Sequence, residues 1–207
     1  MLALLQELQT KESLGILAGV ISAIAYVPYV ISIFKRQTKP SRSSWWIWSL
    51  IGLLILLTYR SVGAISTIWV PLVFFIAPAV IAVLSLRFGE NTALTWLDKI
   101  CLLGAAMSMI FWLSLDSAAI ALYINIFMDL LGFVPTLTKT YARPLGESKT
   151  GWILFFVGSV LNVLAIDKFV VSIALYPIYM FSMDILMLSL LYRKRVNILN
   201  PTIIQHE

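Results

Sequence analysis

Two carboxylates lie inside long apolar stretches of this chain. Asp129 lies near the middle of residues 117–140, and Asp184 lies within residues 169–192. A charged side chain at the centre of a bilayer costs about 2.5–3.5 kcal/mol on insertion scales, and such residues usually mark a substrate or ion pathway. Because burial favours the neutral form of a carboxyl group, either aspartate could be protonated in one state and ionised in another. This is the chemistry of a proton-coupled carrier; a structural carboxylic acid paired with a nearby donor is the alternative.

Asp129 shares one predicted helical face with other polar and small residues. Asn125 stands four residues before it, Gly132 three residues after it and Thr136 seven residues after it. These spacings place all four residues on the same side of a helix. We therefore expect this stripe to point into a helical bundle rather than at lipid.

One motif occurs twice, 107 residues apart. The sequence YVPY at 26–29 ends an apolar stretch and precedes a basic loop and a Trp-rich stretch, and FVPT at 133–136 does the same. Adding 107 to the first residue of each pair gives the second: Pro28 and Pro135, Arg36 and Arg143, Ser41 and Ser148, Trp45 and Trp152. In a membrane protein, a repeat of this size usually indicates two homologous halves around a central solute site.

The first copy of the repeat supplies a second polar face. Ser22 stands at the repeat position of Asp129, and Tyr26 and Tyr29 lie on its side of the predicted helix. We expect the two polar faces to enclose one cavity. Asn162, in the stretch 150–166, is a further candidate to donate to a polar solute, or merely to bond a neighbouring helix.

The tryptophans are divided by position. Trp48 and Trp112 are candidates for stacking on a solute. The others stand near predicted helix ends, where an interfacial aromatic belt is the ordinary explanation: Trp45, Trp46, Trp69, Trp96 and Trp152.

Composition indicates an integral membrane protein. Of the 207 residues, 60% are apolar and 12% are charged, and the mean hydropathy is +0.94, which leaves too little polar surface for a soluble globule. A membrane-spanning helix needs about 20 mostly apolar residues. Seven stretches qualify, at roughly 13–34, 44–59, 64–86, 97–115, 117–140, 150–166 and 169–192. We predict an all-α, multi-pass membrane protein that forms a single transmembrane domain over residues 1–207.

Basic residues fall mainly on one side of these predicted spans. That side, expected to be cytoplasmic, carries Lys35, Arg36, Lys39, Arg42, Arg87, Lys99, Lys139, Arg143, Lys149, Arg193, Lys194 and Arg195, and the other carries Lys11, Arg60 and Lys168. The amino terminus is thus predicted outside, and the short tail 193–207 in the cytoplasm, of a plasma or inner membrane. The same bias accounts for the net charge of +5, so the expected partners are the lipid bilayer, a small solute and a proton rather than nucleic acid.

The doubled motif predicts two three-helix units, because an odd linker helix gives both units the same orientation in the membrane. Repeat one covers about 13–86, the linker helix about 97–115 and repeat two about 117–192. WVPL at 69–72 and LYPI at 175–178 align 106 residues apart.

Proline removes a helical hydrogen bond and favours a kink. We therefore expect hinges or gates at four prolines: Pro28, Pro135, Pro71 and Pro177.

The chain has a three-plus-one-plus-three plan, with a proline late in the first and fifth predicted helices and a basic Ser-rich loop after each of them. In these features it resembles the SWEET and PQ-loop transporter superfamily. FSMDI at 181–185 also resembles the last helix of PQ-loop lysosomal amino-acid transporters. The resemblance implies alternating access. Tyr29 and Thr136 stand where the motif has glutamine, and the stretch 64–86 lacks the asparagine of sugar carriers. Sugar specificity therefore does not carry over.

The expected function is transport of a small polar organic solute, such as an amino acid, a sugar or a vitamin precursor, with or without proton coupling. The alternative is a non-transporting receptor with the same fold, like the KDEL receptor, although that use favours a basic cavity.

We expect no enzyme, cofactor or metal site, because the only histidine is His206, the only cysteine is Cys101, and no phosphate-binding loop or metal-ligand spacing occurs. Assembly into a homo-oligomer stays open.

Overall fold

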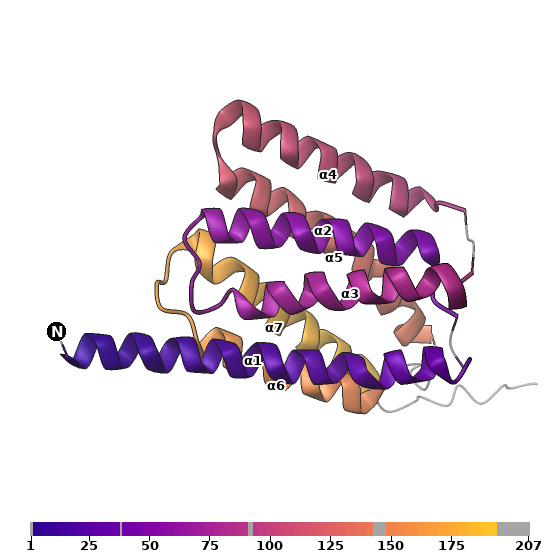
Figure 1. Cartoon of the computed structure of the whole chain (residues 1–207), viewed down its shortest axis with the longest axis horizontal. Helices are drawn as coiled ribbons and strands as arrows, with labels where there is room; N and C mark the ends of the chain where they lie inside the picture. Colours follow the sequence, from indigo (N-terminus) through magenta and orange to yellow (C-terminus); the bar gives the residue numbers. More distant parts are fainter. Residues whose placement is uncertain (1, 38, 91–92, 143–147, 194–207) are drawn as a thin grey trace, which may run out of the picture.

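The structure, a computed structural model, describes residues 2–37, 39–90, 93–142 and 148–193. Seven α-helices account for most of them, and no strand occurs in these ranges (Figure 1). The helices are α1 Leu2–Phe34, α2 Arg42–Ser61, α3 Trp69–Phe88, α4 Trp96–Leu115, α5 Ala118–Ala142, α6 Lys149–Leu164 and α7 Val171–Tyr192. The prediction of an all-α protein is confirmed.

Within the described residues, five helical segments are long and apolar enough, by length and composition, to cross a membrane. They are Gln6–Phe34, Trp69–Phe88, Trp96–Leu115, Ala118–Thr138 and Val171–Tyr192. Helix α6 is also apolar but shorter, with 16 residues. Large apolar side chains are exposed on the outer faces of these helices, as at Leu113, Val83 and Leu103. An exposed apolar exterior of this kind fits a multi-pass integral membrane protein.

Helix α1 is longer than its apolar stretch predicts. It begins at Leu2 rather than near residue 13, and its amino-terminal part extends beyond the neighbouring helices in Figure 1. The residues concerned, 2–12, are mostly Leu, Ala, Gln, Glu and Lys, all of which favour helix. Helix propensity therefore carries α1 past the apolar segment that hydropathy detects.

We name the helices by their order in the chain: α1, α2 and α3 are the first group, and α5, α6 and α7 are the second. Helix α3 packs against both α1 and α2, and α7 packs against both α5 and α6. The groups meet where α1 contacts α6 and where α2 contacts α5, while α4 lies at the outside against α5 and α2 (Figure 1). By their order in each group, α1 corresponds to α5, and α2 corresponds to α6. The contact of α1 with α6 therefore corresponds to the contact of α5 with α2.

The second helix of each group begins with the same hydrogen bond. The Ser41 hydroxyl accepts from the Ser44 backbone N–H at 3.4 Å, and the Ser148 hydroxyl accepts from the Gly151 N–H at 3.2 Å. Serine at this position satisfies a backbone donor that the helix itself leaves unpaired. Because Ser148 is the repeat partner of Ser41, the two caps begin α2 and α6 at corresponding places.

Tyr59 joins the two groups near one end of the bundle. Its side chain is fully buried, and its hydroxyl donates to the Ile173 carbonyl of α7 at 2.6 Å while lying 2.6 Å from the Thr67 hydroxyl. In α7 this carbonyl would normally pair with the N–H of residue 177, which is proline and has none. Tyr59 of α2 therefore satisfies a backbone group that Pro177 leaves without its helical partner.

Replacing Tyr59 with phenylalanine tests this bond. Tyr59→Phe keeps the ring but leaves the Ile173 carbonyl without the tyrosine donor, so we expect the free energy of unfolding to fall by about 1–3 kcal/mol. The measurement is the melting temperature of the purified protein in detergent. Tyr123→Phe is the matched control, because Tyr123 is 37% exposed on α5 and its loss of a hydroxyl should leave the melting temperature unchanged. Equal melting temperatures for the two variants would contradict this role for Tyr59.

Candidate functional site

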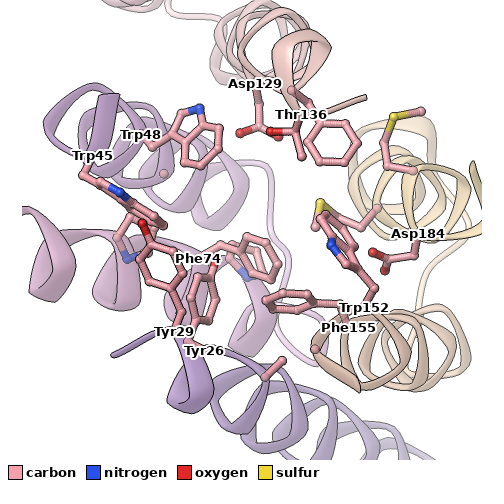
Figure 2. A pocket seen from close by; sticks show the side chains of 18 of the residues that line it. Tyr26, Tyr29, Trp45, Trp48, Phe74, Asp129, Thr136, Trp152, Phe155 and Asp184 are labelled. Carbon is pink, nitrogen blue, oxygen red and sulfur yellow. The ribbon is translucent and has the colours of Figure 1, made fainter. Parts of the chain in front are cut away.

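A cavity of about 640 Å³ lies between the two groups of helices (Figure 2). Helices α1, α2 and α3 of one group and α5, α6 and α7 of the other all line it, whereas no described residue of α4 does. Small-molecule sites usually have volumes of about 300–1,000 Å³. The cavity is therefore large enough for a small organic solute.

The cavity lining follows the sequence repeat. Six pairs of lining residues stand 107 positions apart: Tyr26 and Phe133, Tyr29 and Thr136, Ser41 and Ser148, Ser44 and Gly151, Trp45 and Trp152, Trp48 and Phe155. In α3 and α7 the interval is 106, and it pairs Phe74 with Met180 and Pro78 with Asp184. The cavity thus lies where equivalent surfaces of the two groups face each other.

Several residues predicted from sequence come together here. The predicted residues that line the cavity are Asp129, Asp184, Tyr26, Tyr29, Pro28 and Pro71. Pro177 is buried in α7 but is not among the lining residues. Pro135 lies in α5, and its side chain is outside the described part of the structure.

Three other predicted binding residues are buried between helices instead. Asn125 faces α4, because its side-chain oxygen accepts from the Ser108 hydroxyl at 2.8 Å. Ser22 faces α6, where a Cβ added to Gly158 would lie 2.5 Å from the serine hydroxyl. Asn162 is fully buried, and its side-chain amide has no hydrogen-bond partner among the described residues. None of the three lines the cavity.

Asp129 is held by the neighbouring helix. The Tyr179 hydroxyl of α7 donates to a carboxylate oxygen of Asp129 at 2.8 Å, and the Asp129 side chain is half-buried. In Figure 2, Asp129 and Thr136 both extend from α5 into the cavity. One oxygen of this carboxylate is thus satisfied within the protein.

Asp184 lies across the cavity from the first group of helices. Its side chain is only 2% exposed, and one carboxylate oxygen, Oδ2, has no hydrogen-bond partner among the described residues. The Ser159 hydroxyl of α6 lies close to the carboxylate, which Figure 2 shows directed into the cavity. A buried carboxylate with an unpartnered oxygen retains capacity to accept from a bound group.

Aromatic rings form much of the remaining wall. Tyr26, Phe74 and Phe155 contact one another, with ring centroids 5.0 to 5.6 Å apart. Trp152 continues this cluster at 5.6 Å from Phe155, and Trp45 lies between Tyr29 and Trp48 at 5.2 and 5.4 Å. Such separations are those of favourable aromatic pairs.

Sequence reasoning missed part of this aromatic wall. Trp45 and Trp152, expected in an interfacial belt, line the cavity, and so do Phe74 and Phe155, whereas Trp112 of α4 does not. The repeat interval could have identified Phe155 as a wall residue, because Phe155 stands 107 residues after Trp48, one of the two predicted stacking candidates.

The two ends of the cavity have different linings. Tyr176 lines one end, and its ring centroid lies 5.5 Å from that of Tyr59, with both side chains nearly inaccessible. At the opposite end the lining includes Ser41 and Ser148, the residues that cap α2 and α6. The cavity therefore has different surroundings at its two ends.

A comparison of this chain with protein-family models, with curated proteins and with solved structures found no match. The shape of the cavity and the chemistry of its lining therefore carry the functional proposal.

Gly52 sets the distance between α2 and α3 beside the cavity. A Cβ at this position would lie 2.6 Å from the Phe74 carbonyl oxygen and 3.1 Å from the Phe75 Cα atom. The Phe74 carbonyl stands four residues before Pro78, so proline leaves it without the usual helical donor. Glycine lets α2 pack directly against this stretch of backbone.

Adding one methyl group at Gly52 tests this packing. Gly52→Ala forces α2 away from α3, so we expect the free energy of unfolding to fall by about 1–3 kcal/mol despite the better helix propensity of alanine. Gly151→Ala is the matched control, since Gly151 also lines the cavity but its added Cβ would meet no atom closer than 3.4 Å. Melting in detergent compares the two. A Gly52→Ala protein as stable as the control would contradict close packing at this site.

Proposed function

We propose that this protein is a membrane carrier that moves a small polar organic solute by alternating access. In this proposal the two groups of helices are the repeats of a seven-span, three-plus-one-plus-three fold, and α4 is the linker helix. The amino terminus lies outside and the carboxyl terminus in the cytoplasm, as the distribution of basic residues predicts. The plan is that of the SWEET and PQ-loop superfamily, which the sequence resembles.

The observation that carries the proposal is the cavity shared by the two groups. It lies at their interface, its lining repeats at intervals of 107 and 106 residues, and it contains two aspartates inside mainly apolar helices. Carriers built from repeats bind their solute at such an interface, near the middle of the membrane. A protein whose cavity was only a packing defect would have no reason to keep carboxylates there.

The two ends of the cavity support an inward-facing state. Ser41 and Ser148, at one end, follow the basic loops that the charge distribution places in the cytoplasm. Tyr59 and Tyr176 lie at the other end, and both side chains are nearly inaccessible. Opening the outer end would require the bond between Tyr59 and Ile173, which joins the groups, to break. Rocking of one group against the other would then expose the cavity to the opposite side.

The prolines supply places where the helices can bend during such a movement. Pro28 and Pro71 line the cavity, and Pro177 frees the carbonyl that Tyr59 binds. A helix without one of its hydrogen bonds bends at lower cost than an intact one. We assign Pro28 and Pro177, together with Pro135, the repeat partner of Pro28, to hinges of the carrier. Pro71 stands in the first turn of α3, where a proline removes no helical hydrogen bond.

The carrier proposal predicts that Asp129 is needed for transport. Asp129→Asn removes the negative charge but keeps an oxygen that can accept from Tyr179, so the fold should persist while uptake falls about tenfold or more, the equivalent of about 1.4 kcal/mol. A solute is first identified by thermal stabilisation against sugars, amino acids, amines and vitamin precursors at pH 5.5 and 7.5. Uptake of that solute into proteoliposomes is then measured.

The matched control is Asp116→Asn, because Asp116 is exposed at the turn between α4 and α5, and asparagine tolerates its left-handed backbone. This variant should transport at the original rate. Normal uptake by Asp129→Asn would remove Asp129 from the mechanism. Solute binding without any uptake by the unaltered protein would favour a receptor over a carrier.

A further inference from the structure

We propose that the cavity selects an organic cation, meaning a solute with a positively charged nitrogen on an apolar or aromatic body. This inference rests on the proposed function of the same cavity and names its substrate class. Asp184 faces the charge, and the cluster formed by Tyr26, Phe74, Phe155 and Trp152 surrounds the rest of the solute.

The charge of the lining is the first argument. Asp129 and Asp184 are the charged side chains among the described residues around the cavity, where no lysine, arginine or histidine occurs. A solute carboxylate bound there would leave water without gaining an opposite charge. Anions are therefore disfavoured, and an amino-acid zwitterion gains less than the corresponding amine.

The two aspartates differ in how well the protein satisfies them. Asp129 already accepts the Tyr179 hydroxyl, whereas Asp184 is nearly inaccessible and its Oδ2 has no partner among the described residues. Leaving such an acceptor unpaired in a buried site is costly. An ammonium group that reaches this oxygen, once the side chains covering it move aside, can donate to it. Asp184 is therefore the aspartate with an unmet need for a donor, while the half-buried Asp129 is the more accessible of the two.

The aromatic wall is the third argument. The faces of aromatic rings are electron-rich and attract cations within about 6 Å of the ring centroid, and cages of such rings bind quaternary ammonium groups. Tyr26, Phe74 and Phe155 come from three helices, α1, α3 and α6, and their centroids are 5.0 to 5.6 Å apart. These rings offer an apolar body a matching surface and add attraction for a positive charge.

The position of the amides weighs against a sugar. A sugar has many hydroxyl groups that need partners when it leaves water. The two buried asparagines, Asn125 and Asn162, would be suited to this task, but both lie between helices outside the cavity lining. The described lining offers tyrosine, serine and threonine hydroxyl groups but no side-chain amide.

Binding of matched probes tests the inference. We would titrate the purified protein in detergent with 2-phenylethylammonium and with 2-phenylethanol, which replaces the ammonium group by a hydroxyl, and follow tryptophan fluorescence and calorimetry. The expected result is a dissociation constant at least about tenfold lower for the cation. Benzyltrimethylammonium, which cannot donate a hydrogen bond, should also bind. Equal affinity for the alcohol, or tighter binding of zwitterionic phenylalanine than of the amine, would overturn the inference.

Variants connect the binding to the named residues. Asp184→Asn should weaken 2-phenylethylammonium about tenfold or more and leave 2-phenylethanol unaffected, whereas Asp116→Asn should change neither. If Asp184→Asn fails to fold, Phe155→Leu provides the test, with Phe127→Leu as control because Phe127 is exposed on α5. Phe155→Leu should weaken benzyltrimethylammonium, and the control should not. Cation affinity that is unchanged in both cavity variants would overturn the assignment.

Proteoliposome uptake separates this inference from the carrier proposal. If 2-phenylethylammonium binds but is not taken up, the substrate class stands for the site and the carrier function fails. If a sugar or a zwitterion is taken up while neither cation binds, the carrier function stands and the cation inference fails.

Discussion

The position of α2 in the bundle depends on two backbone carbonyls that prolines leave without a helical partner. Inside an apolar environment such a carbonyl has no water to bind. Pro177 frees the carbonyl of Ile173, which accepts the Tyr59 hydroxyl, and Pro78 frees the carbonyl of Phe74, beside which Gly52 packs. Tyr59 and Gly52 both belong to α2. This one helix is therefore fixed against α3 of its own group and α7 of the other, and the cavity forms beside it.

The two contacts between the groups are built from different residues. Where α1 meets α6, small residues allow close approach, with Ser22 against Gly158. Where α2 meets α5, the Trp48 ring packs over Gly132, whose added Cβ would lie 2.8 Å from the indole nitrogen. The same two-fold packing is thus reached once with small polar atoms and once with a large ring. Equivalent helices need not carry equivalent residues, provided that one side of each contact is a glycine.

The sequence predicts the helices well, because hydropathy and length report directly on buried or lipid-facing segments, although it places the start of α1 too late. It also identifies Asp129 and Asp184 as cavity residues, because a carboxylate in an apolar segment is costly to expose to lipid and therefore faces the interior of the bundle. Asn125 is different: helical periodicity gives the face on which it lies but not the neighbouring helix, which proved to be α4. Ser22 and Asn162 are buried between helices for the same reason. Periodicity alone cannot separate a cavity wall from a helix contact.

The repeat is symmetric in shape but not in charge. The repeat partner of Asp129 is Ser22, and the partner of Asp184 is Pro78, so both carboxylates of the cavity belong to α5 and α7. The aromatic side chains, by contrast, come from both groups. Within the proposed carrier, a movement of one group against the other would carry both aspartates with the second group, while the rings of the first group shift relative to them. The charge-binding part of the site would then persist through the cycle, and the aromatic wall would be the part that opens and closes.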